Sequence, residues 1–251
     1  MATIGLSLRE PPFTADEPVP ILGAEVGGVT IAALASAVGF WSGRAGEMPA
    51  ARAAFDVLRA KAEQDSEYGS VDWGARLPEA FEAAFQALAA MPWPADADAD
   101  TPYACLVAVV ATGDSLWIGW AGDLVVARVS ECAVVEHTVA HCPLAEFEHA
   151  EPGTVLKPEH REKIDGFKSR YLDGRRGASK GPEFTRWAAL RPGERLLITP
   201  YSVFALVRNR LPEPTLDDPQ WLRSVLAIDA ERRNEYGHQV VGDRLGALVR
   251  G

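Results

Sequence analysis

The feature that most constrains this chain is a run of β-rich segments joined by very short turns. Four segments rich in β-branched and aromatic residues follow one another, at 103–112, 115–121, 124–129 and 133–139. Two or three residues separate them, and the breaks carry Gly-Asp or Ser-Glu, which are typical of turns. Connections this short require antiparallel pairing, because parallel strands need a crossover of roughly a dozen residues. The sequence therefore predicts a four-stranded antiparallel meander.

Helical patterns dominate the part of the chain before the meander. Apolar residues recur at helical spacing in 50–64 and 78–91, and residues 32–41 are apolar and rich in alanine, so all three segments are expected to be helical. After the meander we expect a strand, a helix and a last strand, at 195–199, 221–232 and 245–249. The segregation of strands from helices favours an α+β fold over a doubly wound parallel sheet.

The charge balance excludes two classes of partner. With 25 Lys and Arg against 35 Asp and Glu, the net charge is −10, and a field of this sign repels nucleic acid and anionic membrane surfaces. No apolar run approaches the ~20 residues of a membrane helix, and no basic and apolar leader opens the chain. Together with an Ala-rich composition and more Arg than Lys, this predicts a cytoplasmic bacterial protein, and a length of 251 residues fits one domain.

Cysteine, histidine and aspartate patterns do not by themselves predict a metal site. The 3 cysteines share no CxxC spacing, so reduced thiols are expected rather than disulfides or a zinc knuckle. His137 and His141 lie about 13 Å apart on an extended strand, which favours exposed histidines over a zinc site. Asp96, Asp98 and Asp100 alternate like calcium ligands but lack the central Gly and final Glu, which favours a solvated acidic loop.

Residues 143–186 are charged and Gly-rich, with little periodicity, which predicts a long loop or flap. This segment holds a basic cluster of Arg175, Arg176 and Lys180. Two interpretations of the cluster stay open. It is either a solvated loop or a surface that captures a phosphorylated or acidic segment.

Short motifs recur along the chain in a recognisable order. The segments that carry them are 27–36, 112–123, 137–142, 169–172, 191–198 and 242–249. In this order they are similar to the patterns DGmGGh…AS, gd-x-lyvahvGDSR, lT-x-DHs, l-t-R-x-l-G, pGDxlLLcSDGl and sDNiTxlvv of the metal-dependent type 2C serine/threonine protein phosphatases, the PPM family. The resemblance spans nearly the whole chain.

The resemblance implies an α+β fold, a four-layer α-β-β-α sandwich of two antiparallel sheets flanked by helix pairs. It also implies a single type 2C phosphatase-like domain over residues 1–251, with a variable flap-like excursion at about 143–186. In the family, two Mn²⁺ or Mg²⁺ ions bridged by carboxylates activate the water that attacks a phosphoserine or phosphothreonine.

The positions that match the family's conserved aspartates have mostly lost their carboxylates. The aspartates of the DGmGG, SDG and DHs patterns fall on Ala24, Pro200 and Ala140. A methyl group cannot bridge two cations, so the resemblance implies a weakened metal site. Asp243 keeps a metal-ligand position, and Glu25 and Asp16 are looser counterparts of other ligands.

We therefore expect a pseudophosphatase-like binding or regulatory module that needs no cofactor and has a protein or a phosphorylated peptide as partner. Its candidate binding residues are Arg175, Arg176, Lys180 and Asp123. The alternative is an active Mn²⁺- or Mg²⁺-dependent phosphoserine/phosphothreonine phosphatase whose metal site is rebuilt from Glu25, Asp16 and Asp243, together with Asp123. A third interpretation is a sensor of a small molecule or a phosphopeptide that uses the same cleft without metal.

Overall fold

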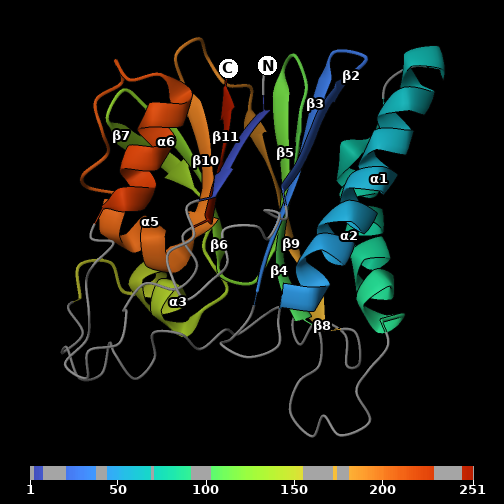
Figure 1. Ribbon diagram of the computed structural model, residues 1–251, viewed down its shortest axis with the longest axis horizontal. Coiled ribbons are helices and arrows are strands. Elements are labelled where there is room, and N and C mark those ends of the chain that lie inside the picture. Colours follow the sequence, from blue (N-terminus) through green and yellow to red (C-terminus); the bar gives the residue numbers. More distant parts are fainter. Residues whose placement is uncertain are drawn as a thin grey trace, which may run out of the picture.

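The computed structural model shows two antiparallel β-sheets packed face to face, with helices on both outer faces (Figure 1). It describes residues 3–7, 21–37, 44–68, 71–91, 103–154, 172–173, 181–228 and 245–250. This arrangement confirms the predicted α+β fold and its four-layer α-β-β-α sandwich.

The first sheet, called sheet 1, has the strand order β2-β3-β4-β5-β9, and a short strand β8 pairs with β4. Its strands are β2 (Ile21–Val26), β3 (Val29–Ala37), β4 (Tyr103–Ala111), β5 (Ser115–Ala121), β8 (Leu172–Asp173) and β9 (Glu183–Ala188). Tight turns join β2 to β3 and β4 to β5 at the same end of the sheet. Helices α1 (Arg44–Tyr68) and α2 (Trp73–Ala89) cover its outer face.

The second sheet, called sheet 2, has the strand order β1-β11-β10-β6-β7. Its strands are β1 (Thr3–Ser7), β6 (Leu124–Ser130), β7 (Ala133–His137), β10 (Arg195–Pro200) and β11 (Leu245–Arg250). Helices α3 (Pro143–Ala150), α5 (Tyr201–Val207) and α6 (Asp218–Ala227) cover its outer face. The strands expected at 195–199 and 245–249 are confirmed. Helix α6 begins earlier than expected because the Asp217 carboxylate accepts a hydrogen bond from the Gln220 N–H.

The central core lies between the two sheets and follows from the alternation of side chains along each strand. Even-numbered residues of β3 and odd-numbered residues of β4 face the other sheet, while their neighbours face α1 and α2. The core between the sheets includes Leu34, Val107, Ile118, Val126, Ile198 and Val249. Because both faces of the central strands are buried, these strands are almost continuously apolar.

The helical predictions for 50–64 and 78–91 are confirmed. The first segment lies within α1, and the second lies in α2 except for its last two residues. Helix α2 begins at Trp73 because the Asp72 carboxylate accepts hydrogen bonds from the first backbone N–H groups of the helix. None of the described helices combines the length and the hydropathy that crossing a membrane requires.

The prediction of a helix over 32–41 is wrong in its described part, because that part belongs to strand β3. The strand opens with three β-branched residues, and Gly27 and Gly28, with φ of 58° and 80°, form the turn of a hairpin with β2. Pairing on both sides and burial on both faces outweigh the helical propensity of the alanines. Ala24 therefore lies within β2, and Gly27 and Gly28 connect one strand to the next.

The meander prediction is right about the four strands and wrong about their common sheet. β4 pairs with β5 in sheet 1, whereas β6 pairs with β7 in sheet 2. The link of Gly122 and Asp123 therefore carries the chain from one sheet to the other. Gly122 has a φ of 95°, and a Cβ atom there would lie 2.2 Å from Cys105 Sγ and 2.9 Å from Cys105 Cα. A residue with a side chain cannot take this place without moving β4.

We expect Gly122→Ala to lower the free energy of unfolding by about 3–5 kcal/mol, because it combines a left-handed backbone with overpacking against Cys105. The matched control is Gly193→Ala, since Gly193 has a φ of 87° and open space around its Cα. Gly193→Ala should lower the free energy of unfolding by about 1–2 kcal/mol, because only the left-handed backbone is strained there. Urea unfolding measures both values, and equal losses would show that the close approach to Cys105 carries no energy.

Candidate functional site

The link between β5 and β6 lies at one end of the sandwich, beside the junction of β10 and α5. We call this end, formed by Gly122, Asp123, Pro200 and Tyr201, the crossover end. The Tyr201 N–H donates a hydrogen bond to the Asp123 carbonyl over 2.7 Å. Pro200, the last residue of β10, pairs with Leu124, the first residue of β6. The two connections are thus fixed against each other by backbone contacts.

Several polar atoms of the crossover end are buried. The Asp123 N–H donates to Cys105 Sγ at 3.4 Å, and Asp123 Oδ1 has almost no exposed surface. Cys105 lies directly opposite Ser36 in the pairing of β4 with β3, and both residues are buried. Ser36 Oγ makes no hydrogen bond within the described chain. By strand alternation, Ser36 and Cys105 both face the space between the sheets.

Residues 138–142 form a strap that binds both sheets next to this end. Thr138 exchanges two hydrogen bonds with Val126 of sheet 2, and the Trp120 indole of sheet 1 donates to the Val139 carbonyl at 2.9 Å. The His141 N–H donates to the Gly122 carbonyl, and the Gly122 N–H donates to His141 Nδ1. The strap therefore holds the link between β5 and β6 from the outside.

His141 is 2% exposed and has a defined orientation. Because Nδ1 accepts a hydrogen bond, the neutral ring carries its proton on Nε2. Nε2 faces the Glu183 carboxylate at 3.6 Å, and the ring lies against Trp120. His141 is thus a structural group that connects the strap, the link and strand β9.

A second polar cluster fastens α3 to α5. The Tyr201 hydroxyl and Arg208 Nη2 each donate to Glu148 Oε2 at 2.8 Å. Burial raises the pKa of Tyr201 well above its ordinary value, and the hydrogen bond to the Glu148 carboxylate raises it further. Tyr201 begins α5 immediately after Pro200, so this cluster also fixes the junction at the crossover end.

No protein-family model and no curated protein matches the sequence, whereas solved structures do. The serine/threonine phosphatase of S. agalactiae aligns with a TM-score of 0.69 and 12% identity over 100% of this chain and 99% of that one. PppA, a key regulatory component of T6SS in Pseudomonas aeruginosa, aligns with a TM-score of 0.62 and 14% identity, over 98% of this chain and 95% of that one. The catalytic domain of the phosphatase PstP in complex with 2 manganese ions aligns with a TM-score of 0.59 and 17% identity, over 98% of this chain and 95% of that one. The chain has the type 2C phosphatase fold.

Within this type 2C phosphatase fold, two of the candidate ligands lie at opposite ends of the sandwich. Glu25 is exposed and pairs with Thr30 next to the turn between β2 and β3. That turn shares its end of sheet 1 with the turn between β4 and β5, whereas Asp123 follows the other end of β5. Figure 1 shows the turn between β2 and β3 at the top of the molecule and α3 near the bottom. The structure does not bring Glu25 and Asp123 together.

The remaining predicted positions are distributed as follows. Ala24 packs toward the cluster under α1, and Ala140 is buried in the strap. His137 contacts the Phe204 ring, and Cys132 is exposed in the turn between β6 and β7. Asp16, Asp96, Asp98, Asp100, Arg175, Arg176, Lys180 and Asp243 lie outside the described residues.

The described residues of the crossover end do not fit the two-metal centre that the family uses. Two hard divalent cations need several oxygen ligands and a bridging carboxylate. Pro200 presents a ring where the SDG pattern has its aspartate, and the neighbouring Ser36 and Cys105 offer a hydroxyl and a thiol. Asp123 supplies the single carboxylate among the four residues of this end. Throughout the described part of the chain, no three His, Cys, Asp or Glu side chains come together in a way that could hold a metal ion.

Most of the contacts that shape this end leave no motif in the sequence. Ser36 is the last residue of the 27–36 motif, but its segment is predicted to be helical, so the sequence does not place it opposite Cys105. Glu148 and Glu183 lie in the charged excursion and carry no motif, so no sequence signal connects them to Tyr201 and His141. The expectation of an exposed His141 is wrong, because this side chain is buried and holds the backbone of Gly122.

We expect Tyr201→Phe to lower the free energy of unfolding by about 2 kcal/mol near neutral pH, because the hydroxyl donates to a carboxylate. The unfolded tyrosine loses its proton at about pH 10, while the folded one keeps it. The folded wild type therefore loses stability as pH rises above about 10, by up to ~1.4 kcal/mol per pH unit, and the variant lacks this loss.

Chemical unfolding of both proteins from pH 7 to 11 measures this effect. The difference in stability between wild type and Tyr201→Phe should shrink above about pH 10. A difference that stays constant across the range would contradict the proposed burial of the neutral hydroxyl.

Proposed function

We propose that this protein is a pseudophosphatase-like binding or regulatory module, a type 2C phosphatase fold that works without two-metal catalysis. The observation that carries the proposal is Pro200. It ends β10 beside Asp123, where the SDG pattern of the family places a carboxylate, and its ring has no atom that can bind a cation. The junction is held instead by backbone hydrogen bonds and by Tyr201.

The geometry disfavours the alternative of an active phosphatase with a rebuilt site. That alternative needs Glu25 to join the other carboxylates, but Glu25 lies beside the turn between β2 and β3, at the other end of sheet 1 from Asp123. Its side chain cannot cross the length of a strand, which rises about 3.3 Å per residue. The remaining candidates for that site are Asp123, Asp16 and Asp243.

The partner that suits this proposal is a phosphorylated or acidic segment of another protein. Arg175, Arg176 and Lys180 place three cations within six residues of an acidic chain, and arginine binds phosphate with paired, charge-assisted hydrogen bonds. The net charge of −10 limits non-specific attraction of nucleic acid and anionic membranes. We propose that the protein acts in the cytoplasm and requires neither Mn²⁺ nor Mg²⁺.

We expect no hydrolysis of a phosphoserine peptide in millimolar Mn²⁺ above the rate without protein. Phosphate release measures this, with Asp243→Ala as the matched variant because Asp243 keeps a family ligand position. Turnover by the wild type that disappears in Asp243→Ala would overturn the proposal. Calorimetric titration with Mn²⁺ should give no saturable heat for either protein, and a two-site isotherm that needs Asp243 would count equally against it.

We expect the wild type to bind a fluorescein-labelled phosphoserine peptide, and the double variant Arg175→Ala/Arg176→Ala to bind it about 10-fold more weakly. Fluorescence anisotropy at two salt concentrations measures both affinities, because a charge-based interaction weakens as salt rises. The control is the same peptide without phosphate. Equal affinity for the two peptides would contradict a phosphate-binding role of the basic cluster.

A further inference from the structure

Strand β9 forms one edge of sheet 1 and pairs along its whole length with β5. The Ala189 N–H donates toward β5, to the Asp114 carbonyl. The Ala188 carbonyl points the other way, where it accepts a hydrogen bond from Arg128 of sheet 2. Because backbone groups alternate in direction along an antiparallel strand, the N–H and C=O groups of Phe184 and Arg186 also point away from β5. They make no hydrogen bond within the described chain.

Phe184 is a fixed aromatic side chain on this edge. Its ring packs edge-to-face on Phe81 of α2, with centroids 5.4 Å apart. Gly119 of β5 makes this contact possible, because a Cβ atom there would lie 2.6 Å from the Phe81 ring and 3.0 Å from the Phe184 ring. Phe184 nevertheless stays 37% exposed, so a rigid apolar surface faces the solvent.

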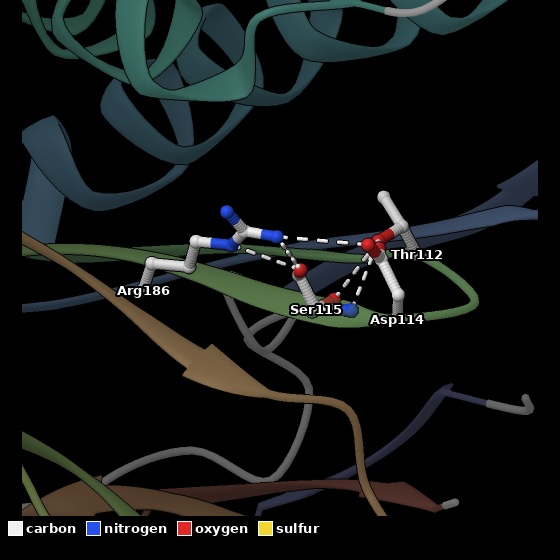
Figure 2. A network of polar contacts seen from close by, with 4 residues as sticks. All are labelled: Thr112, Asp114, Ser115 and Arg186. Atoms are coloured by element: carbon white, nitrogen blue, oxygen red, sulfur yellow. Dashed lines mark hydrogen bonds and ion pairs between the residues drawn. The ribbon is translucent and has the colours of Figure 1, made fainter.

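Arg186 is fixed on the same face of β9, two residues further on. Its Nε and Nη2 atoms both donate to Ser115 Oγ, at 2.9 and 2.6 Å, and its guanidinium lies over the Trp117 ring. Figure 2 shows these contacts and the ion pair with Asp114, at 3.6 Å. The third guanidinium nitrogen, Nη1, makes no hydrogen bond or ion pair within the described chain, and the side chain is 55% exposed.

The opposing carboxylate of Asp114 is already engaged. It accepts a hydrogen bond from the Thr112 hydroxyl at 2.8 Å, which is the main reason why its pKa is lowered, with Ser115 and Arg186 lowering it further. Asp114 therefore stays ionised and held by its own turn, whereas Nη1 of Arg186 is available to a second anionic group.

The edge strand β7 of sheet 2 is protected against pairing with a further strand, whereas the edge strand β9 of sheet 1 lacks this protection. Strand β7 has a register shift in its pairing with β6, and such a bulge interrupts the pattern that a further strand would need. β9 is regular and contains no proline, glycine or lysine. In the described part of the chain, its edge combines unpaired backbone groups, an aromatic ring and an arginine, which are the features of a strand-binding surface.

We propose that the outward edge of β9 binds an extended segment of another protein as an additional antiparallel strand. The segment carries an acidic side chain opposite Arg186 and, two residues later, a large apolar side chain opposite Phe184. Two residues is the spacing that places both side chains on one face of a strand. Phe184 and Arg186 lie on the face of sheet 1 that α2 covers, whereas Ser36 and Cys105 face the space between the sheets, so the proposal does not depend on the proposed function.

A second copy of this chain does not supply the required pattern through β9. The acidic residue of β9, Glu183, alternates onto the opposite face from Phe184 and Arg186. In an antiparallel pairing of two copies through β9, Arg186 would face Phe184, Arg186 or Ala188 and never a carboxylate. The occupant is therefore a different protein segment with the acidic and apolar residues described above.

The test uses two labelled heptapeptides of identical composition, acetylated and amidated at their ends. Thr-Val-Glu-Thr-Phe-Thr-Val carries its acidic and aromatic residues two apart, and Thr-Val-Thr-Glu-Phe-Thr-Val carries them side by side. By fluorescence anisotropy the first should bind at least about 10-fold tighter. Phe184→Ala and Arg186→Gln should each weaken it about 10-fold, while the matched edge variant Val135→Ala should leave its affinity unchanged.

A peptide with Gln in place of Glu separates a direct charge contact from loss of structure. Arg186→Gln should weaken binding of the Glu peptide but not of the Gln peptide. In the free protein, the amides of Phe184 and Arg186 should exchange with solvent at least ~100-fold faster than those of Thr185 and Trp187, and peptide should slow them.

Several outcomes would overturn the proposal. They are equal affinity for the two heptapeptides, no binding of either at millimolar concentration, or protected amides at Phe184 and Arg186 in the free protein. Light scattering, which measures the oligomeric state, provides a further such outcome. A dimer of this chain that Phe184→Ala abolishes would assign the edge to a second copy. If Phe184→Ala fails to fold, the comparison of the Glu and Gln peptides with Arg186→Gln still decides.

Discussion

The link of Gly122 and Asp123 is the constraint on which the rest of the structure depends. Two residues carry the chain from sheet 1 to sheet 2, and a glycine is required because its Cα approaches the backbone of Cys105 in β4. Both backbone groups of Gly122 bind His141 of the strap. The Asp123 N–H binds Cys105 of β4, and the Asp123 carbonyl binds the start of α5. The relative position of the two sheets is therefore fixed at this end, and the groups around it have little freedom to rearrange.

This rigidity has a consequence for chemistry. The catalytic domain of PstP, which has a similar fold, is in complex with 2 manganese ions, yet a fold does not determine a reaction, which depends on the side chains placed on it. Here Pro200, Ser36 and Cys105 contribute a ring, a hydroxyl and a thiol, and Asp123 contributes one carboxylate. Around them the protein places hydrogen bonds and an ion pair that stabilise the fold, such as those of His141, Tyr201 and Glu148.

Three arginines of the described structure pack against tryptophan rings. Arg128, Arg186 and Arg195 each place the guanidinium over a tryptophan ring, at 5.8, 4.9 and 5.2 Å from its centroid. Arg195 is also buried in an ion pair with Asp218 at 3.1 Å, and Arg128 joins the two sheets through Ala188. In a chain of net charge −10, these cations stabilise local contacts. Arg186 differs because half of its side chain stays exposed.

The sequence by itself determined the strands of the meander, the α+β class and the helices at α1 and α2, because these depend on local alternation, helical spacing and turn residues. The resemblance of its ordered motifs also predicted the sandwich. Tertiary structure decided three things that local patterns do not contain. It made the alanine-rich segment that begins at residue 32 a strand, since pairing with β2 and β4 outweighs the intrinsic helical propensity of alanine. It split the meander between two sheets, since a two-residue turn can either pair its strands or cross a sandwich. It also brought Glu148 to Tyr201 and Glu183 to His141, because long-range contacts depend on how the layers pack and leave no periodic signal in the chain.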